Sequence, residues 1–246
     1  MPTDVLVTLA SVAATSEVIA EGTIRVLDHG FVRLDDSMAD DLSVVNAARV
    51  SFARRKEEMD ESDHGLIRFL LRERHGTPFE HNSFRFHVRA PLFVAREWFR
   101  HRVGSFNEFS MRYARATDDF YVPEPEDVRT QVGKPGSYSF ETVDPELAEA
   151  TRDELRAVYD EAYATYERLV ERGVARELAR LVMPVGAYTE FYWTVNARSL
   201  MNFVSLRAAE TAQREIRRYA DACERFLEEK MPVTHAAFVA AGRTAP

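Results

Sequence analysis

The chain has a single cysteine, Cys223, which has no disulfide partner within the chain. Proteins without disulfides suit a reducing compartment, so we expect a cytoplasmic location. Cys223 keeps helical spacing with Ile216, Tyr219 and Phe226, and this spacing predicts a buried position in the core. The sequence therefore offers no catalytic thiol.

Several short motifs of common enzyme classes are missing as well. The chain has no P-loop, GxGxxG, GxSxG, HExxH or paired CxxC, which argues against a P-loop nucleotidase, a serine hydrolase and a zinc enzyme. We therefore expect no metal site. Ten glycines among 246 residues leave little material for a glycine-lined phosphate cradle. If a phosphate is bound, arginine must hold it.

Long apolar runs and a basic charge balance are also absent. No run reaches the roughly 18 to 20 apolar residues of a membrane-spanning helix. Val5–Ala14 resembles the core of a signal peptide, but acids flank it where basic residues are expected, so we predict a soluble, unsecreted protein. The formal net charge of -8 argues against nucleic acid or a membrane surface as a partner.

The chain does have ample core material, because 46% of its residues are apolar and 11% are aromatic. Strands are predicted at Thr23–Leu34, as two short strands around an Asp-His-Gly turn, at Ser83–Arg89 and at Ala187–Val195. Apolar and basic residues alternate in Ser83–Arg89, so one face of that strand belongs to the core and the other is basic.

Helices are predicted from capping residues and spacing. Asp41 is expected to open one helix, and Asp63 to cap another that ends at His75-Gly76. There glycine would supply the left-handed geometry, and "TPFEH" would follow as a loop. Apolar residues at helical spacing predict two further helices, at Leu155–Leu169 and Ala209–Phe226.

Two more helices and one loop complete this interpretation. Proline is tolerated in the first turn of a helix, so Pro91 is expected to start one that runs to Arg102. Asn196 is expected to cap a helix that ends near Arg207. The segment Pro123–Pro145 is rich in Pro, Gly and Ser and is therefore interpreted as a long surface loop.

Positive charge is concentrated in Phe99–Arg115, "FRHRVGSFNEFSMRYAR", which surrounds one carboxylate, Glu108, with four arginines and a histidine. Ser105, Asn107 and Ser110 add hydroxyl groups and an amide. This mixture suits a phosphorylated heterocycle, because guanidinium forks bind phosphate while amides and carboxylates bind ring edges and ribose hydroxyls.

A structural alternative exists for each of two charged positions. Glu97 and His101 are four residues apart, so they could simply pair on an exposed helix. Arg207 continues the apolar stripe of its helix, and a buried guanidinium must meet an anion or several acceptors. That anion is either a ligand or a structural partner, Glu210 or Glu190, and the residues alone leave both open.

The stretch "RHRVGSFNEFSMRY" resembles the RHR-x7-S signature of the flavin-dependent thymidylate synthases. The defining positions are Arg100, His101, Arg102 and Ser110. Other blocks are similar in the family's order, namely "AARVSF", "HGTPFEH", "FHVRAPLFVAREWFRHR" and "WTVNARSLMNFVSLR". The resemblance spans roughly Thr23 to Phe238, which implies a synthase domain at 23–241 after an N-terminal extension at 1–22.

The resemblance implies an α+β fold, a single domain with a sheet flanked by helices and a helical C-terminal half. It implies a homotetramer whose active sites lie between subunits. The implied reaction is reductive methylation of dUMP to dTMP, with carbon from methylenetetrahydrofolate and hydride from NADPH through FAD. Two alternatives stay open, a same-fold flavoprotein that acts as an NADPH oxidase or regulator, and a non-enzymatic nucleotide-binding module.

The resemblance also implies site roles. The cofactor set is Ser51, Thr77, Arg100, His101, Arg102 and Glu108, with Asn196, Arg198 and Asn202 approaching the cofactor from another subunit. The dUMP set is Glu97, Arg100, Glu108, Ser110, Met111, Arg112, Arg180 and Arg207. Arg207 is the implied catalytic residue, since a cation at the uracil ring stabilises charge that develops as C5 becomes nucleophilic. His75 and Glu80 are implied to help hold flavin or folate.

Two positions depart from the family's pattern. Position 97 is Glu where the family carries glutamine, and Met111 stands where a small residue is common. A carboxylate that faces a nucleotide phosphate would repel it, so Glu97 is expected to turn toward Arg100 or His101 or to contact a neutral edge. Both departures put the affinity for dUMP in doubt more than the reaction.

Overall fold

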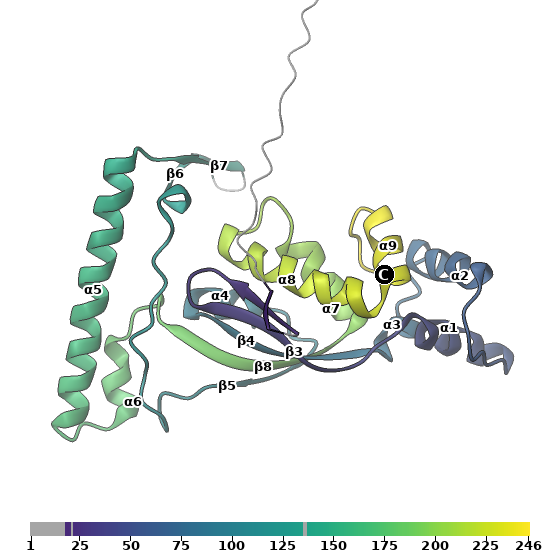
Figure 1. Ribbon diagram of the computed structural model, residues 1–246, viewed down its shortest axis with the longest axis horizontal. Helices are drawn as coiled ribbons and strands as arrows, with labels where there is room; N and C mark the ends of the chain where they lie inside the picture. The colour runs from purple at the N-terminus through teal and green to yellow at the C-terminus, as the bar shows by residue number, and fades with distance from the viewer. Residues whose placement is uncertain (1–17, 21, 135–136) are drawn as a thin grey trace, which may run out of the picture.

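The structure, a computed structural model, describes residues 18–20, 22–134 and 137–246, so the signal-like run Val5–Ala14 lies outside its described part. These residues form the predicted α+β fold, in which helices cover one face of a six-stranded antiparallel sheet (Figure 1). The boundary between 1–22 and 23–241 stays a prediction. Within the described ranges, every helix is too short or too polar to cross a membrane.

The sheet has the strand order β1-β2-β3-β4-β8-β5. Its strands are β1 (Val18–Ala20), β2 (Thr23–Val26), β3 (Gly30–Met38), β4 (Ser83–Pro91), β8 (Tyr188–Asn196) and β5 (Ser105–Glu108). The pair β2–β3 confirms the two strands predicted around the Asp-His-Gly turn. In β4 the apolar positions Phe84, Phe86 and Val88 are fully buried, which confirms its core face.

Three helices cover one face of this sheet (Figure 1). They are α4 (Leu92–Trp98), α7 (Ala197–Arg207) and α8 (Arg214–Lys230). Trp98, Trp193, Phe203 and Tyr219 are completely buried between these helices and the sheet. Cys223 on α8 is buried too, which confirms its predicted core position, and burial raises the pKa of its thiol.

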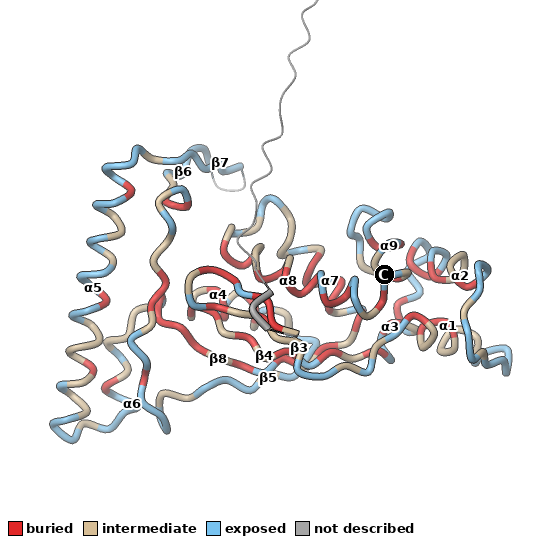
Figure 2. The backbone as a smooth tube through the Cα atoms, in the orientation of Figure 1, coloured by how far each residue is buried: buried red, intermediate tan, exposed pale blue. Residues whose placement is uncertain are grey.

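Two smaller groups of elements flank the sheet. At one end lie α1 (Asp41–Arg49), η1 (Val50–Phe52), α2 (Glu61–Arg72), α3 (Thr77–Glu80) and α9 (Pro232–Ala240). At the other end lie η2 (Pro125–Asp127), β6 (Arg129–Lys134), β7 (Ser137–Thr142), α5 (Pro145–Glu171), α6 (Arg176–Ala179) and η3 (Arg180–Val182). Figure 2 shows that α5, β6 and β7 are mostly exposed.

One predicted helix start was confirmed, and one predicted helix cap was wrong by three residues. Helix α1 begins at Asp41, as predicted, and Asp40 caps it by accepting a hydrogen bond from the Ser43 backbone N–H at 2.6 Å. Asp60 caps α2, and the Asp63 carboxylate accepts from the Asp60 backbone N–H at 2.9 Å, so the two acids form a reciprocal capping box. Asn196 does cap α7, as predicted, by accepting from Ser199 at 2.8 Å.

The predicted end of α2 at His75-Gly76 was also wrong. The helix ends at Arg72, and Arg74 takes the left-handed conformation with φ of 57°. Gly76 is right-handed, with φ of -72°, and precedes the short helix α3, where a loop was predicted. The glycine is therefore present for a reason other than helix termination.

Three further segments differ from the sequence prediction. Pro91 ends β4 and precedes α4, and α4 stops at Trp98 rather than continuing to Arg102. The predicted loop at Pro123–Pro145 contains η2 and the two-stranded hairpin β6–β7. Strand β5 was not anticipated, because its four residues carry no alternating pattern.

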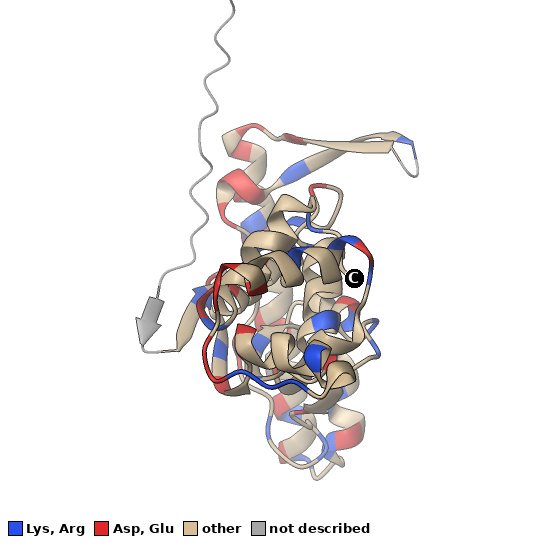
Figure 3. Ribbon diagram, turned by 90° about the vertical axis from the view of Figure 1, so that its right-hand side faces the viewer, with Lys and Arg blue, Asp and Glu red and all other residues tan. Residues whose placement is uncertain are grey.

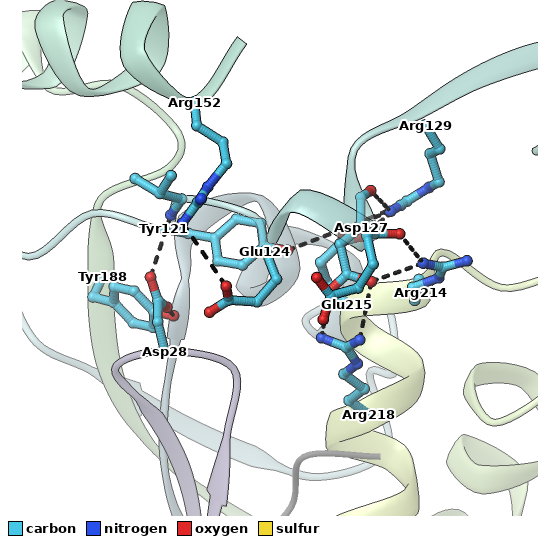
Figure 4. Close-up of polar contacts among 12 residues, drawn as sticks. Asp28, Tyr121, Glu124, Asp127, Arg129, Arg152, Tyr188, Arg214, Glu215 and Arg218 are labelled. Carbon is cyan, nitrogen blue, oxygen red and sulfur yellow. Dashed lines mark hydrogen bonds and ion pairs between the residues drawn. The ribbon is translucent and has the colours of Figure 1, made fainter. Parts of the chain in front are cut away.

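The base of the β6–β7 hairpin is fixed to α8 by a cluster of charged side chains (Figure 4). Asp127 is buried and pairs with Arg214 and Arg218, each at 2.7 Å. Arg129 forms a two-pronged contact with the buried Glu215 at 3.0 and 3.1 Å. These contacts hold a segment that packs few apolar side chains of its own.

Replacing Asp127 by alanine should leave two arginines without their carboxylate. We expect the free energy of unfolding to fall by about 2 to 3 kcal/mol. Breaking a fully buried pair costs ~3 to 5 kcal/mol, and the loss here should be smaller because Arg214 and Arg218 still reach solvent. Urea unfolding checks this. As a matched control, Asp153→Ala removes an exposed partner of Arg156 and should cost below ~0.5 kcal/mol. Equal losses for both variants would contradict the role of the Asp127 cluster.

Candidate functional site

A cleft of about 990 Å³ opens where the end of α4 meets α7, and we call it the arginine cleft. Among the predicted site residues, it is lined by Glu80, Arg100, His101, Arg102, Arg198, Asn202 and Arg207. The basic tripeptide lies here because α4 ends at the buried Trp98 and the chain then turns. The turn is closed by a hydrogen bond from the His101 backbone N–H to the Trp98 carbonyl at 2.9 Å.

Arg207, at the end of α7, reaches across to α4 with three donors. Its Nη1 lies 3.0 Å from Glu97 Oε2, its Nη2 donates to the Glu97 carbonyl at 3.2 Å, and its Nε donates to His101 Nε2 at 2.9 Å. Arg207 therefore has a structural partner, but neither Glu210 nor Glu190 as predicted. The alternative in which Glu97 pairs directly with His101 is replaced too, because both side chains contact Arg207.

Burial and this contact shift the pKa values of His101 and Glu97. Burial, reinforced by the positive charge of Arg207, lowers the pKa of His101 to about 4. His101 is thus neutral at pH 7, and because Nε2 accepts from Arg207 its proton is assigned to Nδ1. Burial raises the pKa of Glu97, although Arg207 opposes that rise. The guanidinium is held by one carboxylate and one neutral ring.

Arg100 and Arg102 differ from Arg207 in having free guanidinium groups. Both are exposed, and neither makes an ion pair with any residue that the structure describes. Figure 3 shows basic segments on the face next to the C-terminus. The arginine cleft lies beside the same terminus, because Pro246 lines it. Across residues 18–20, 22–134 and 137–246 no group of His, Cys, Asp or Glu is arranged to hold a metal ion. The donor set fits an anionic ligand with more than one phosphate.

A second cavity, of about 560 Å³, lies beside α3, and we call it the α3 cavity. It contains Ser51, His75 and Thr77, and it shares Arg198 with the arginine cleft. Arg198 Nη1 lies 2.6 Å from Glu80, while its Nε donates to the main-chain oxygen of Pro246 at 2.8 Å. The two cavities therefore meet at one guanidinium.

Asn196 belongs to neither cavity, although the resemblance implied a cofactor role. Its side-chain oxygen accepts from the Ser199 backbone N–H and so caps α7. Conversely, Ala245 and Pro246 line the arginine cleft, and sequence reasoning missed them. Neither has a chemically distinctive side chain, so only the path of the chain after α9 could reveal their place.

The remaining predicted residues gather around the loop that follows β5. This loop carries Ser110, Met111 and Arg112, and we call it the Ser110 loop. They are Glu108, Ser110, Met111, Arg112 and Arg180. Glu108 accepts from the Thr189 hydroxyl at 2.9 Å, and Arg112 pairs with the exposed Glu177 at 3.2 Å. Arg180 donates to the Glu177 main-chain oxygen at 3.4 Å. Sequence reasoning missed Glu177, whose weak surface pairing leaves Arg112 available to a stronger anion.

One chain does not bring the Ser110 loop to the arginine cleft. Strand β5 runs between them, with Ser105 opposite Thr194 and Glu108 opposite Phe191 on β8. Ser105 and Glu108 are three residue steps apart, and at about 3.3 Å per step the ends of this strand are separated by roughly 10 Å. The two groups of predicted ligands thus lie at opposite ends of an edge strand.

An α+β protein with this geometry presents arginine forks of the kind that suit a phosphate-bearing ligand. More particularly, the chain belongs to the family described as Thymidylate synthase complementing protein, whose model matches residues 33–233. The resemblance stated from the RHR-x7-S signature is thereby confirmed.

Individual relatives agree with this family. The Flavin-dependent thymidylate synthase of Thermosipho africanus is 48% identical over 215 residues, 87% of this chain and 93% of the relative. That of Thermus thermophilus is 49% identical over 216 residues, 88% of this chain and 78% of the relative. The solved structure of the UMP/dUMP methylase PolB from Streptomyces cacaoi bound with 5-Br dUMP matches with a TM-score of 0.82 and 46% identity, over 91% of this chain and 100% of that one.

The lowered pKa of His101 predicts a pH effect on stability. In the unfolded chain this histidine becomes protonated below its ordinary pKa of 6.5, whereas in the folded chain it becomes protonated only near its lowered pKa of about 4. The unfolded state binds more protons in this window, so stability should fall as pH falls from 6.5 to 4.

The variant His101→Gln keeps an acceptor for Arg207 but cannot titrate. We expect the free energy of unfolding of this variant to fall less than that of the wild type as pH drops from 6.5 to 4. The difference between the two proteins should stay below the ~1.4 kcal/mol per pH unit of one fully linked proton, because the ring is partly exposed. Urea unfolding of both proteins at pH 7, 5.5 and 4.5 measures the difference. Parallel pH profiles would contradict the assigned pKa direction.

Proposed function

We propose that this protein is a flavin-dependent thymidylate synthase that methylates dUMP to dTMP. Methylenetetrahydrofolate would supply a methylene group and leave as tetrahydrofolate. NADPH would supply the hydride that reduces the methylene group to methyl and would become NADP+, and the C5 hydrogen of uracil would leave as a proton. The observation that carries the proposal is the arginine cleft, where an oriented Arg207 stands beside the unpaired Arg100 and Arg102. The names of the relatives and the solved methylase support it.

The donor set supports FAD as the resident cofactor. Arg100, Arg102 and Arg198 would hold its diphosphate, because guanidinium forks bind phosphate oxygens bidentately. Ser51 and Thr77, in the α3 cavity, would contact the part of the cofactor beyond Arg198. When bound, FAD supplies the redox chemistry that carries hydride from NADPH to the one-carbon unit.

Arg207 would act on the pyrimidine. Its guanidinium is oriented by Glu97 and His101, so little reorganisation is needed when charge develops on the uracil carbonyl. Glu97 is turned onto Arg207, in place of the partners expected from sequence, and its negative charge is thereby kept away from a nucleotide phosphate.

The separation of the two ligand groups supports a shared site. Ser110, Arg112 and Arg180 would bind the phosphate of dUMP, yet β5 holds them away from Arg207 of the same chain. In a homotetramer, the Ser110 loop of one subunit would complete the arginine cleft of another. The proposed cytoplasmic location rests on the lone, buried Cys223.

The function is tested by the purified protein itself. It should show the absorption spectrum of bound FAD, bleach with NADPH, and form dTMP when dUMP and methylenetetrahydrofolate are added. Bleaching without dTMP would favour the NADPH oxidase or regulator, and a colourless protein that binds dUMP would favour the non-enzymatic module. UMP assayed beside dUMP tests the ribose preference, because PolB is described as a UMP/dUMP methylase.

Replacing Arg207 should separate the two half-reactions. For Arg207→Ala we expect flavin reduction by NADPH to stay near normal while dTMP formation falls about 10² to 10³-fold, a loss of ~3 to 4 kcal/mol in the transition state. Anaerobic bleaching and dTMP formation are measured separately. Arg156→Ala, on the exposed face of α5, is the matched control and should leave both rates unchanged. An equal fall in both half-reactions would assign Arg207 to cofactor binding instead.

A mixture of two inactive variants should regain activity if sites are shared. Arg207→Ala damages the arginine cleft, and Arg112→Ala damages the Ser110 loop. After unfolding and refolding together, about a quarter of the sites should combine an intact cleft with an intact loop from another chain. Activity is measured against each variant refolded alone. A mixture no more active than its components would place both halves of the site on one chain.

A further inference from the structure

Gly76 has no backbone reason to be glycine. Its φ of -72° and ψ of -32° are right-handed and suit any residue, since only a positive φ favours glycine. The residue is buried where α2 gives way to α3. The reason for glycine must therefore lie in its surroundings.

The atoms nearest to an added Cβ all belong to one side chain, that of Arg198. A Cβ added at Gly76 would lie 2.6 Å from Cζ and 2.8 Å from Cδ of Arg198, and closer still to Nε. All three nearest atoms belong to the far end of one flexible side chain. Gly30 provides a contrast, because a Cβ there would strike the main-chain oxygens of Val26 at 2.5 Å and Arg89 at 2.9 Å.

The position of Arg198 is unusually well defined for an exposed arginine. Glu80 holds its Nη1 at 2.6 Å, the Pro246 oxygen holds its Nε at 2.8 Å, and the backbone of Gly76 supports the flat guanidinium from behind. Neither of these contacts uses Nη2, so this nitrogen can donate to a ligand. The group lies where the arginine cleft and the α3 cavity meet.

We infer that Gly76 is a positioning residue for Arg198: by lacking a side chain, it lets the guanidinium lie at the junction of the two cavities, where it meets the diphosphate of the bound dinucleotide. This inference rests on the proposed function, because it takes FAD as the ligand that spans both cavities. In this role Gly76 acts through Arg198, because a glycine has no side chain with which to hold the cofactor.

The substitution Gly76→Ala has a distinctive expected result. Since the methyl group would displace only a flexible side chain, the melting temperature should stay within a few degrees of the wild type. FAD affinity should fall about tenfold, because Arg198 would lose a charge-assisted hydrogen bond to phosphate. Gly30→Ala, which meets main-chain atoms, should instead lower the melting temperature clearly.

A double-mutant cycle on FAD binding tests the inference. Flavin-depleted wild type, Gly76→Ala, Arg198→Ala and the double variant are titrated with FAD, and the quenching of flavin fluorescence gives each dissociation constant. We expect the double variant to bind FAD as Arg198→Ala does, since Gly76 acts only through the arginine. Gly65→Ala is the matched control, because a Cβ there meets nothing nearer than Arg68 at 4.0 Å, and it should bind FAD normally.

The other outcomes are equally decisive. A Gly76→Ala variant that binds FAD like the wild type would overturn the inference. So would a tenfold loss that persists when Arg198 is already alanine, because glycine would then act independently of it. Failure of the wild type to bind FAD would overturn the proposed function together with the inference, whereas flavin binding with additive losses overturns the positioning role alone.

Discussion

The burial of Trp98 is the constraint on which the candidate site depends. Its ring is completely buried and packs against Phe203 of α7, at 4.7 Å between ring centroids, and against Trp193 of β8 at 5.3 Å. Large aromatic contacts of this kind are strong and geometrically specific. Because Trp98 is the last residue of α4, its anchoring fixes where the basic tripeptide begins. The same packing fixes α7, and with it Arg198 and Arg207.

Charged side chains have two different roles in this protein, one structural and one at the candidate site. The buried cluster at the base of the β6–β7 hairpin neutralises Asp127 and Glu215 with arginines, which makes it a structural device. In the arginine cleft, Arg207 is neutralised by Glu97, while Arg100 and Arg102 keep their charge toward solvent. An acidic protein thus presents a local cationic site. The net negative charge of the chain repels polyanions in general, while the cleft suits an anion of matching shape.

Patterns with a physical period predicted much of the fold. The alternation in β4 and the helical spacing around Cys223 were confirmed, because each reports burial of one face. Features that depend on distant contacts were missed: strand β5 exists through pairing with β8, and the exact caps depend on which of two neighbouring acids reaches a free N–H. The signature identified the cleft residues Arg100, His101 and Arg102, but not their separation from Ser110, since a motif carries no information on the strand between its parts. The role of Gly76 was misjudged because its neighbour Arg198 lies far along the chain.

The coupling between flavin oxidation and methyl transfer can be measured in a single anaerobic turnover. The bound flavin is reduced with NADPH, excess NADPH is removed, and dUMP with methylenetetrahydrofolate is added while the flavin absorbance is followed. A flavin-dependent methylation predicts that the flavin reoxidises without oxygen and that one dTMP appears for each flavin oxidised. A flavin that stays reduced until oxygen is admitted, with no dTMP formed, would contradict it and identify an oxidase of the same fold.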